Sequence, residues 1–215
     1  MKKIVNKNIN INSNYFILAL FFSLFFLNFN AQTVETVAGV QGVTGNNNGV
    51  VSIAKFNNPH GIEVDLIGNI FVADRFNHLI RKIDTSGNVT TIAGSGVSGS
   101  QDGQGLTASF NEPWALTIDS LGFIYVADTK NNKIRKISPS GLVTTLAGAG
   151  SFGVKDSPNP LIATFGNPTG IAIDKNGNLF IGDHLTHLIR KITPQGEVST
   201  LAGDKNYPNS YGLVD

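Results

Sequence analysis

The 215-residue chain contains no cysteine, a single methionine and a single tryptophan, and only 14% of its residues are charged. Because there is no cysteine, disulfide-stapled folds are excluded, even for a protein exported into an oxidising compartment. The composition also excludes collagenous and coiled-coil chains. The chain also contains 24 glycines. Few charged residues together with many glycines favour short elements joined by tight turns over the long helices of an all-α fold.

The formal net charge of +1 depends on an amino-terminal segment that differs from the rest of the chain. Three of the 16 basic residues, Lys2, Lys3 and Lys7, lie in that segment, and the 13 that remain face 15 acidic residues. The remainder therefore has no excess of positive charge with which to bind a polyanion. Nucleic acid and anionic membranes are not expected partners.

The amino-terminal segment is typical of a secretory signal peptide. Thirteen residues from Tyr15 to Leu27 are apolar except for Ser23, and they follow a basic stretch. A spanning helix needs about 20 apolar residues, so this run predicts cleavage and leaves no stable membrane span. We expect a signal peptide over residues 1–31 and a secreted, periplasmic or cell-surface protein. An uncleaved anchor is the alternative, because Phe29 is large for a position three residues before a cut after Ala31.

Three blocks of the sequence repeat one another. They run from Phe56 to Gly94, from Phe110 to Gly148 and from Phe165 to Gly203, with spacings of 54 and 55 residues. Such a period indicates a repeat architecture. The segment Thr33–Gly39 matches only the last part of a block, which predicts a lone outer strand over 33–39.

Each block contains four short runs rich in β-branched and aromatic residues, separated by turn residues. In the first block the runs are 61–65, 70–73, 79–83 and 89–93. The runs are apolar on both faces, so each four-stranded antiparallel sheet must be covered on both sides. This predicts an all-β fold, a β-propeller, with a stacked solenoid as the alternative. Positive φ is expected at the turn glycines, Gly68, Gly122, Gly177, Gly87, Gly141 and Gly196.

The block pattern resembles the NHL repeat, whose name-giving tripeptide is present as Asn77, His78 and Leu79. The second and third blocks depart from it at this loop. The resemblance covers about residues 33–203 and implies a partial propeller over 32–215, with blades near 56–94, 110–148 and 165–203. Proteins of this family usually form six-bladed rings in which an outer strand from one chain end completes a blade at the other. Segment 33–39 resembles that closing strand.

Three blocks are too few to close a ring, which generally needs four or more blades. The sequence stops at Asp215, within a connection of the kind that precedes a new block. A fragment of a longer propeller is therefore expected. The alternative is self-pairing of two chains.

The four histidines, His60, His78, His184 and His187, raise the question of a metal site. The related amidating lyases hold zinc with histidines near the central channel, and streptogramin lyases use a histidine and a metal. Here Trp114 and Thr169 replace His60 in the other blocks, so no ring of ligands recurs, and zinc needs three or four converging ligands. We expect no metal, no cofactor and no catalytic residue in this chain. A metal-dependent lyase or lactone hydrolase, with its site partly in absent blades, stays open as the alternative.

An aspartate ends the second strand of every block, and an arginine follows seven residues later. A group that recurs in every blade is more often structural than catalytic. We therefore expect the hairpin to bring each Asp to its Arg or to the loop amides as a structural device. These residues are Asp74, Arg81, Asp128, Arg135, Asp183 and Arg190.

The connections between blocks vary, and variable loops on a fixed scaffold are where binding specificity usually lies. The resemblance places the connections on the same face as the loops after the Asp-terminated strands. The predicted function is a secreted binding scaffold for a protein or glycan ligand. The predicted contacts are Arg75, His78, Lys130, Asn132, His184 and His187.

Overall fold

The computed structural model describes residues 34–205. The chain divides into two compact units, Met1–Thr36 and Val37–Asp215. Of the first unit only residues 34–36 are described, so the predicted signal peptide and Thr33 lie outside the described residues. No helix within residues 34–205 is long and apolar enough to cross a membrane.

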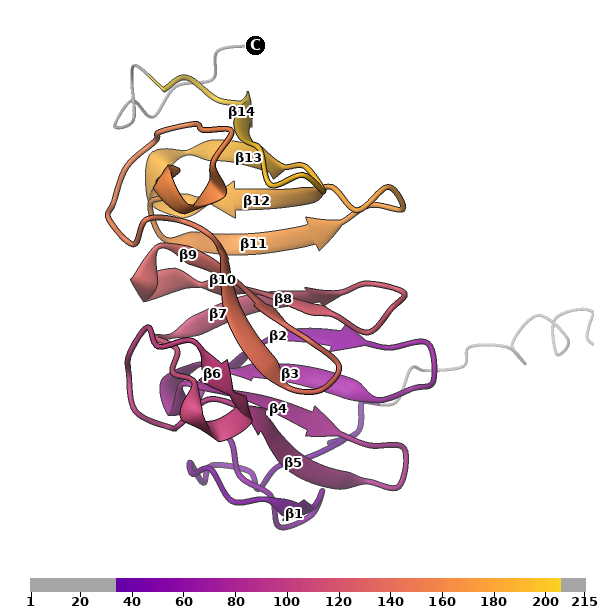
Figure 1. The fold of residues 1–215 in the computed structure, drawn as a ribbon. Helices are drawn as coiled ribbons and strands as arrows, with labels where there is room; N and C mark the ends of the chain where they lie inside the picture. Colours follow the sequence, from indigo (N-terminus) through magenta and orange to yellow (C-terminus); the bar gives the residue numbers. More distant parts are fainter. Residues whose placement is uncertain (1–33, 206–215) are drawn as a thin grey trace, which may run out of the picture. The chain divides into compact units, whose positions relative to one another are not determined.

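The second unit contains three antiparallel sheets, one for each sequence block (Figure 1). This confirms the all-β, four-stranded blades expected from the repeats. The first blade holds β2 (Pro59–Val64), β3 (Ile70–Asp74), β4 (Leu79–Ile83) and β5 (Asn88–Ala93). The second holds β7 (Pro113–Ile118), β8 (Ile124–Asp128), β9 (Lys133–Ile137) and β10 (Leu142–Ala147). The third holds β11 (Pro168–Ile173), β12 (Leu179–Asp183), β13 (Leu188–Ile192) and β14 (Val198–Ala202).

The connections add strands that the sequence pattern does not predict. The segment before the first blade supplies β1 (Gly49–Val50), which pairs with β5, and the segment before the second supplies β6 (Gly103–Gln104), which pairs with β10. In the third blade a single bridge, Ser157 to Val198, takes the same position. Two of the connections also hold one-turn 3₁₀ helices, η2 (Gly105–Thr107) and η4 (Pro160–Ile162). Each connection thus returns along the outer edge of the blade that it precedes.

The outer strand expected over 33–39 is not formed in its described part, residues 34–39. A strand needs a partner with free backbone groups. The blade that a closing strand would complete lies at the other end of a ring, and the described residues contain no further blade beyond the three sheets. Gly39 donates its N–H to the carbonyl of Val51 at 2.9 Å.

The turn glycines adopt the predicted backbone conformation. Gly68, Gly122 and Gly177 have φ of +93°, +83° and +80°, and the glycines of the last turn, Gly87, Gly141 and Gly196, are also positive. An aspartate precedes each first turn and caps it. Asp65, for example, accepts the N–H groups of residues 67 and 69 through Oδ1, at 3.1 and 2.8 Å.

The core lies between neighbouring blades. The side chains of Phe71 and Ile80 from the first blade join Phe110, Leu116 and Val126 from the second in one buried cluster. Equivalent residues of the second and third blades form another. Strands β2, β7 and β11 are the elements through which successive blades meet most extensively. The blades are therefore covered by each other, as the apolar faces of their strands require.

Candidate functional site: the loop face

The loop face is the end of the sheets at which β2, β7 and β11 begin and β3, β8 and β12 end. A one-turn 3₁₀ helix follows each of the latter strands: η1 (Arg75–Asn77), η3 (Thr129–Asn131) and η5 (His184–Thr186). Each helix ends on a residue in the left-handed conformation. All six predicted contacts lie on these helices or at their ends, namely Arg75, His78, Lys130, Asn132, His184 and His187.

A buried ion pair anchors the first of these helices. Asp74 Oδ2 accepts hydrogen bonds from Arg81 Nη1 at 2.8 Å and from Asn77 Nδ2 at 2.7 Å, while Oδ1 accepts the N–H of Asn57 at 2.7 Å. Arg81 also donates to the carbonyl of Lys55 at 3.1 Å. The side chains of both ionised residues are fully buried. The pair thus ties the second strand, the third strand and the preceding connection together.

The same arrangement recurs in the second blade and in altered form in the third. Arg135 donates to Asp128 at 2.8 Å, but the Arg190 to Asp183 distance is 3.5 Å. Thr186 stands where the other blades have asparagine, and Asp183 Oδ2 has no hydrogen-bond partner among the described residues. Burial raises the pKa of the carboxyl groups in all three blades, Asp74, Asp128 and Asp183, against the effect of their donors.

His78 and Asn132 link each blade to the next. Nδ1 of His78 accepts the N–H of Glu112 at 3.1 Å, and Oδ1 of Asn132 accepts the N–H of Asn167 at 2.9 Å. Glu112 and Asn167 are themselves left-handed, with φ of 51° and 58°, immediately before the proline that starts a strand. One acceptor atom of each side chain is therefore used within the protein, and a ligand contact by these two residues stays a prediction.

His78→Leu is expected to lower the free energy of unfolding by about 1–2 kcal/mol, because it leaves the N–H of Glu112 without its acceptor. His78→Asn is the matched control, since asparagine accepts the equivalent N–H in the next blade. Urea denaturation of both variants measures the difference. Equal losses in the two variants would show that the acceptor atom does not matter.

An aromatic and ionic cluster crosses from the first blade to the second on the loop face. The Arg75 guanidinium lies 2.6 Å from Glu112 Oε2 and 4.0 Å from the centroid of the Trp114 ring. The ring of His60 lies 4.0 Å from that of Trp114, tilted by 43°. Burial, and then the charge of Arg75, lower the pKa of His60. We call these four residues the Arg75–Trp114 cluster.

Of the predicted contacts, Arg75 belongs to this cluster and His78 adjoins it through Glu112. Lys130 and His184 lie exposed on the other two helices. Sequence reasoning missed Glu112 and Trp114 as site residues. A signal was present, because His60 and Trp114 occupy the same position in adjacent blocks and the single tryptophan breaks the repeat.

Within residues 34–205 no three histidine, cysteine, aspartate or glutamate side chains gather in a way that could hold a metal ion. His184 and His187, which the sequence places close together, are both exposed. Two carboxylates of the loop face, Asp74 and Glu112, form ion pairs with arginines.

Comparison with known sequences supports the assignment of the repeats. The family model described as NHL repeat matches residues 110–137. The bovine protein named NHL repeat-containing protein 2 is 28% identical over 205 residues, covering 80% of this chain and 28% of that protein. Chicken teneurin-1 is 32% identical over 199 residues, covering 80% of this chain and 7% of that protein. The chain thus spans less than a third of the length of these relatives.

Among solved structures, a protein described as an auxiliary nutrient binding protein from Bacteroides ovatus is similar, with a TM-score of 0.58 and 25% identity. The match covers 71% of this chain and 40% of that chain. The solved structures that the chain resembles are β-propellers, which agrees with the blade architecture described above.

Proposed function

Because the chain belongs to the NHL-repeat family of β-propellers, we propose that it is an exported binding scaffold whose loop face meets an acidic protein ligand. The observation that carries the proposal is the Arg75–Trp114 cluster. Tryptophan and arginine are enriched among the residues that dominate protein interfaces. Here one of each is held in place on the face where the helices η1, η3 and η5 gather.

The cluster is ordered before any ligand arrives. Nε and Nη2 of Arg75 both donate to Glu112 Oε2, at 3.2 and 2.6 Å, and the guanidinium also lies 4.5 Å from the Phe76 ring. The Arg75 and Glu112 side chains are only 17% and 24% exposed. A side chain that is already fixed loses little conformational entropy on binding, which favours affinity.

The charge of this face favours an acidic partner. Glu112 is engaged by Arg75, and the exposed Lys130 has no carboxylate within 4.0 Å among the described residues. Lys133, which follows η3, donates to the Ser100 hydroxyl at 2.7 Å and has no carboxylate within 4.0 Å among residues 34–205. A partner that presents aspartate or glutamate side chains would meet unpaired ammonium groups, and the attraction would weaken with salt.

Two further observations support a binding role outside the cell. The similar Bacteroides ovatus protein is described as nutrient binding, at 25% identity over part of its chain. The basic and apolar segment of residues 1–31 has the pattern of an export signal. Export would place the loop face in contact with extracellular proteins.

The proposal is tested by measuring binding of the full chain to an array of 15-residue peptides graded in aspartate and glutamate content. Binding is expected to increase with acidic content. Arg75→Gln combined with Lys130→Gln should weaken binding of the acidic peptides about tenfold, the loss typical of removing charged contacts. Lys175→Gln with Lys191→Gln, at the other end of the sheets, is the matched control and should change binding less than twofold.

Three outcomes would contradict the proposal. Binding that does not depend on acidic content would exclude an acidic ligand, and equal weakening by both double variants would remove the loop face from the interaction. Selective binding of neutral oligosaccharides on a parallel glycan array, unaffected by salt, would favour a glycan ligand in place of an acidic protein.

A further inference from the structure

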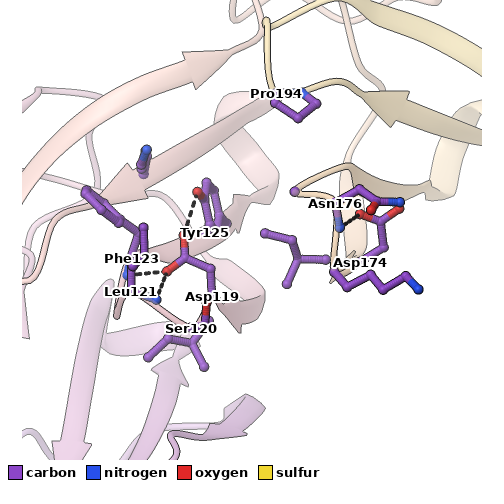
Figure 2. Close-up of a pocket in the computed structure, with 13 residues that line it drawn as sticks. Asp119, Ser120, Leu121, Phe123, Tyr125, Asp174, Asn176 and Pro194 are labelled. Atoms are coloured by element: carbon purple, nitrogen blue, oxygen red, sulfur yellow. Dashed lines mark hydrogen bonds between the residues drawn. The ribbon is translucent and has the colours of Figure 1, made fainter.

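A cleft of about 710 Å³ lies between the second and third blades, at the end of the strands away from the loop face. The turn between β7 and β8 forms one wall and the turn between β11 and β12 forms the other. Figure 2 shows Asp119, Phe123 and Tyr125 on one side and Asp174 and Asn176 on the other. The lining also includes the apolar side chains of Ile118, Leu121 and Ile173 and two lysines, Lys136 and Lys175.

The repeat is broken at this cleft. In the first and third blades the turn aspartate is followed four residues later by asparagine, whose amide donates to the second carboxylate oxygen. Asn69 donates to Asp65 at 2.7 Å and Asn178 to Asp174 at 2.8 Å. The second blade has Phe123 at this position. Since the first and third blades form the same turn with asparagine at this position, phenylalanine is not needed to form it.

A second departure from the repeat, at position 125, supplies the hydrogen-bond donor that Phe123 lacks. Tyr125, which is phenylalanine in the other blades, donates its hydroxyl to Asp119 Oδ2 at 3.1 Å and so replaces the missing amide donor. Burial, followed by the charge of Asp119, raises the pKa of Tyr125 to about 12, so the hydroxyl keeps its proton at neutral pH. The turn keeps its hydrogen bonds, and an aromatic ring is placed in the cleft.

The Phe123 ring makes a cation–π contact with the ammonium group of Lys136. Lys136 Nζ lies 4.0 Å from the centroid of the Phe123 ring and 5.5 Å from that of Tyr125. No carboxylate of the described residues lies within 4.0 Å of this ammonium. Asp119 Oδ1 accepts the N–H groups of residues 121 and 123, at 2.9 Å each, and is therefore committed to the turn. In the first blade the equivalent Lys82 ammonium is 5.9 Å from the centroid of the Phe71 ring, and it has no second aromatic ring as a cation–π partner in the described part of the chain.

We propose that this cleft binds a small carboxylate with a flat apolar body. The carboxylate pairs with Lys136, on the side of the ammonium away from the ring, and the apolar body packs between the walls against Phe123, Leu121 and Ile173. Charge complementarity sets this choice, because two lysines line the cleft, Lys136 and Lys175, and neither has a carboxylate within 4.0 Å among the described residues. Both turn aspartates, by contrast, already accept hydrogen bonds from donors of their own blades. The cleft is independent of the loop-face function.

The test is titration of the full chain with 3-phenylpropionate, followed by ligand-observed NMR, with 3-phenylpropan-1-ol as the neutral probe of the same shape. The acid is expected to bind about tenfold more tightly than the alcohol, as a charge-assisted contact provides. Lys136→Gln should remove this preference. The matched variant Lys82→Gln, at the equivalent position of the first blade, should leave the affinity within twofold.

A second variant, at Phe123, measures the contribution of the aromatic ring to binding separately from that of the Lys136 charge. Phe123→Asn installs the residue that the other blades use, so the turn is expected to form, and it should weaken binding of both probes. The proposal is overturned if the alcohol binds as well as the acid, if Lys82→Gln weakens binding as much as Lys136→Gln, or if Phe123→Asn has no effect. Arg75→Gln is expected to leave the titration unchanged, which distinguishes this site from the loop face.

Discussion

Replacing Arg135 with methionine is expected to lower the free energy of unfolding by about 3–5 kcal/mol, the cost of breaking a buried ion pair by removal of one partner. The Arg135 side chain is fully buried and donates to Asp128 at 2.8 Å. It also donates to the carbonyl groups of Ser109 and Gln101, at 2.9 and 3.0 Å. Methionine fills much of the volume but leaves the Asp128 carboxylate in the core without its cation.

Urea denaturation of the full chain measures this loss. Lys133→Met, on the same strand, is the control. Its ammonium makes one exposed hydrogen bond, to the Ser100 hydroxyl at 2.7 Å, so a change below about 1 kcal/mol is expected. If the two variants lost similar stability, the Asp–Arg pair would not be the structural anchor that its burial indicates.

Gly148→Ala is expected to cost about 3 kcal/mol or more, because two unfavourable effects combine. The backbone at Gly148 has φ of +102°, which L side chains rarely adopt. A Cβ there would also lie 2.5 Å from the carbonyl oxygen of Asn132 and 3.0 Å from Cα of Lys133. Both contacts are with backbone atoms of the same blade, so no side-chain rotation relieves them.

Gly122→Ala is the matched control for this prediction. Gly122 also has positive φ, +83°, but its nearest neighbour would be Cγ of Pro139 at 3.6 Å, an ordinary contact. It should therefore lose only about 1 kcal/mol, the strain of the backbone alone. Thermal and urea unfolding compare the two. A loss at Gly148 no greater than at Gly122 would refute the steric part of the argument.

The blades could be predicted from the sequence because every feature occurs three times. Strand positions and turn glycines that are ambiguous in one block are defined by the other two. Strands β1 and β6 could not be predicted, since two residues that include a glycine carry no alternation of polar and apolar side chains. Segment 33–39 resembles the final strand of a block, but its pairing depends on the blade that it would complete, which composition does not report.

The site was predictable only where it follows the repeat. The spacing of seven residues in a hairpin brings Asp74 to Arg81, and the register of β3 and β4 places them together. The contact between Arg75 and Trp114 joins residues of different blades and has no counterpart in the other blocks, so the repeated sequence pattern does not predict it. Its geometry depends on how neighbouring blades pack, and the block alignment carries no information on that packing.

The exchange at positions 123 and 125 separates the hydrogen bonds of the turn from the identity of the residue that ends it. The second oxygen of Asp119 receives its donor from Tyr125, on the strand, whereas those of Asp65 and Asp174 receive theirs from an asparagine in the turn. Position 123 is thereby released from side-chain hydrogen bonding, so its side chain can be apolar without leaving a carboxylate oxygen unpaired. A blade can therefore change one residue that lines a cleft while its turn aspartate keeps all of its donors.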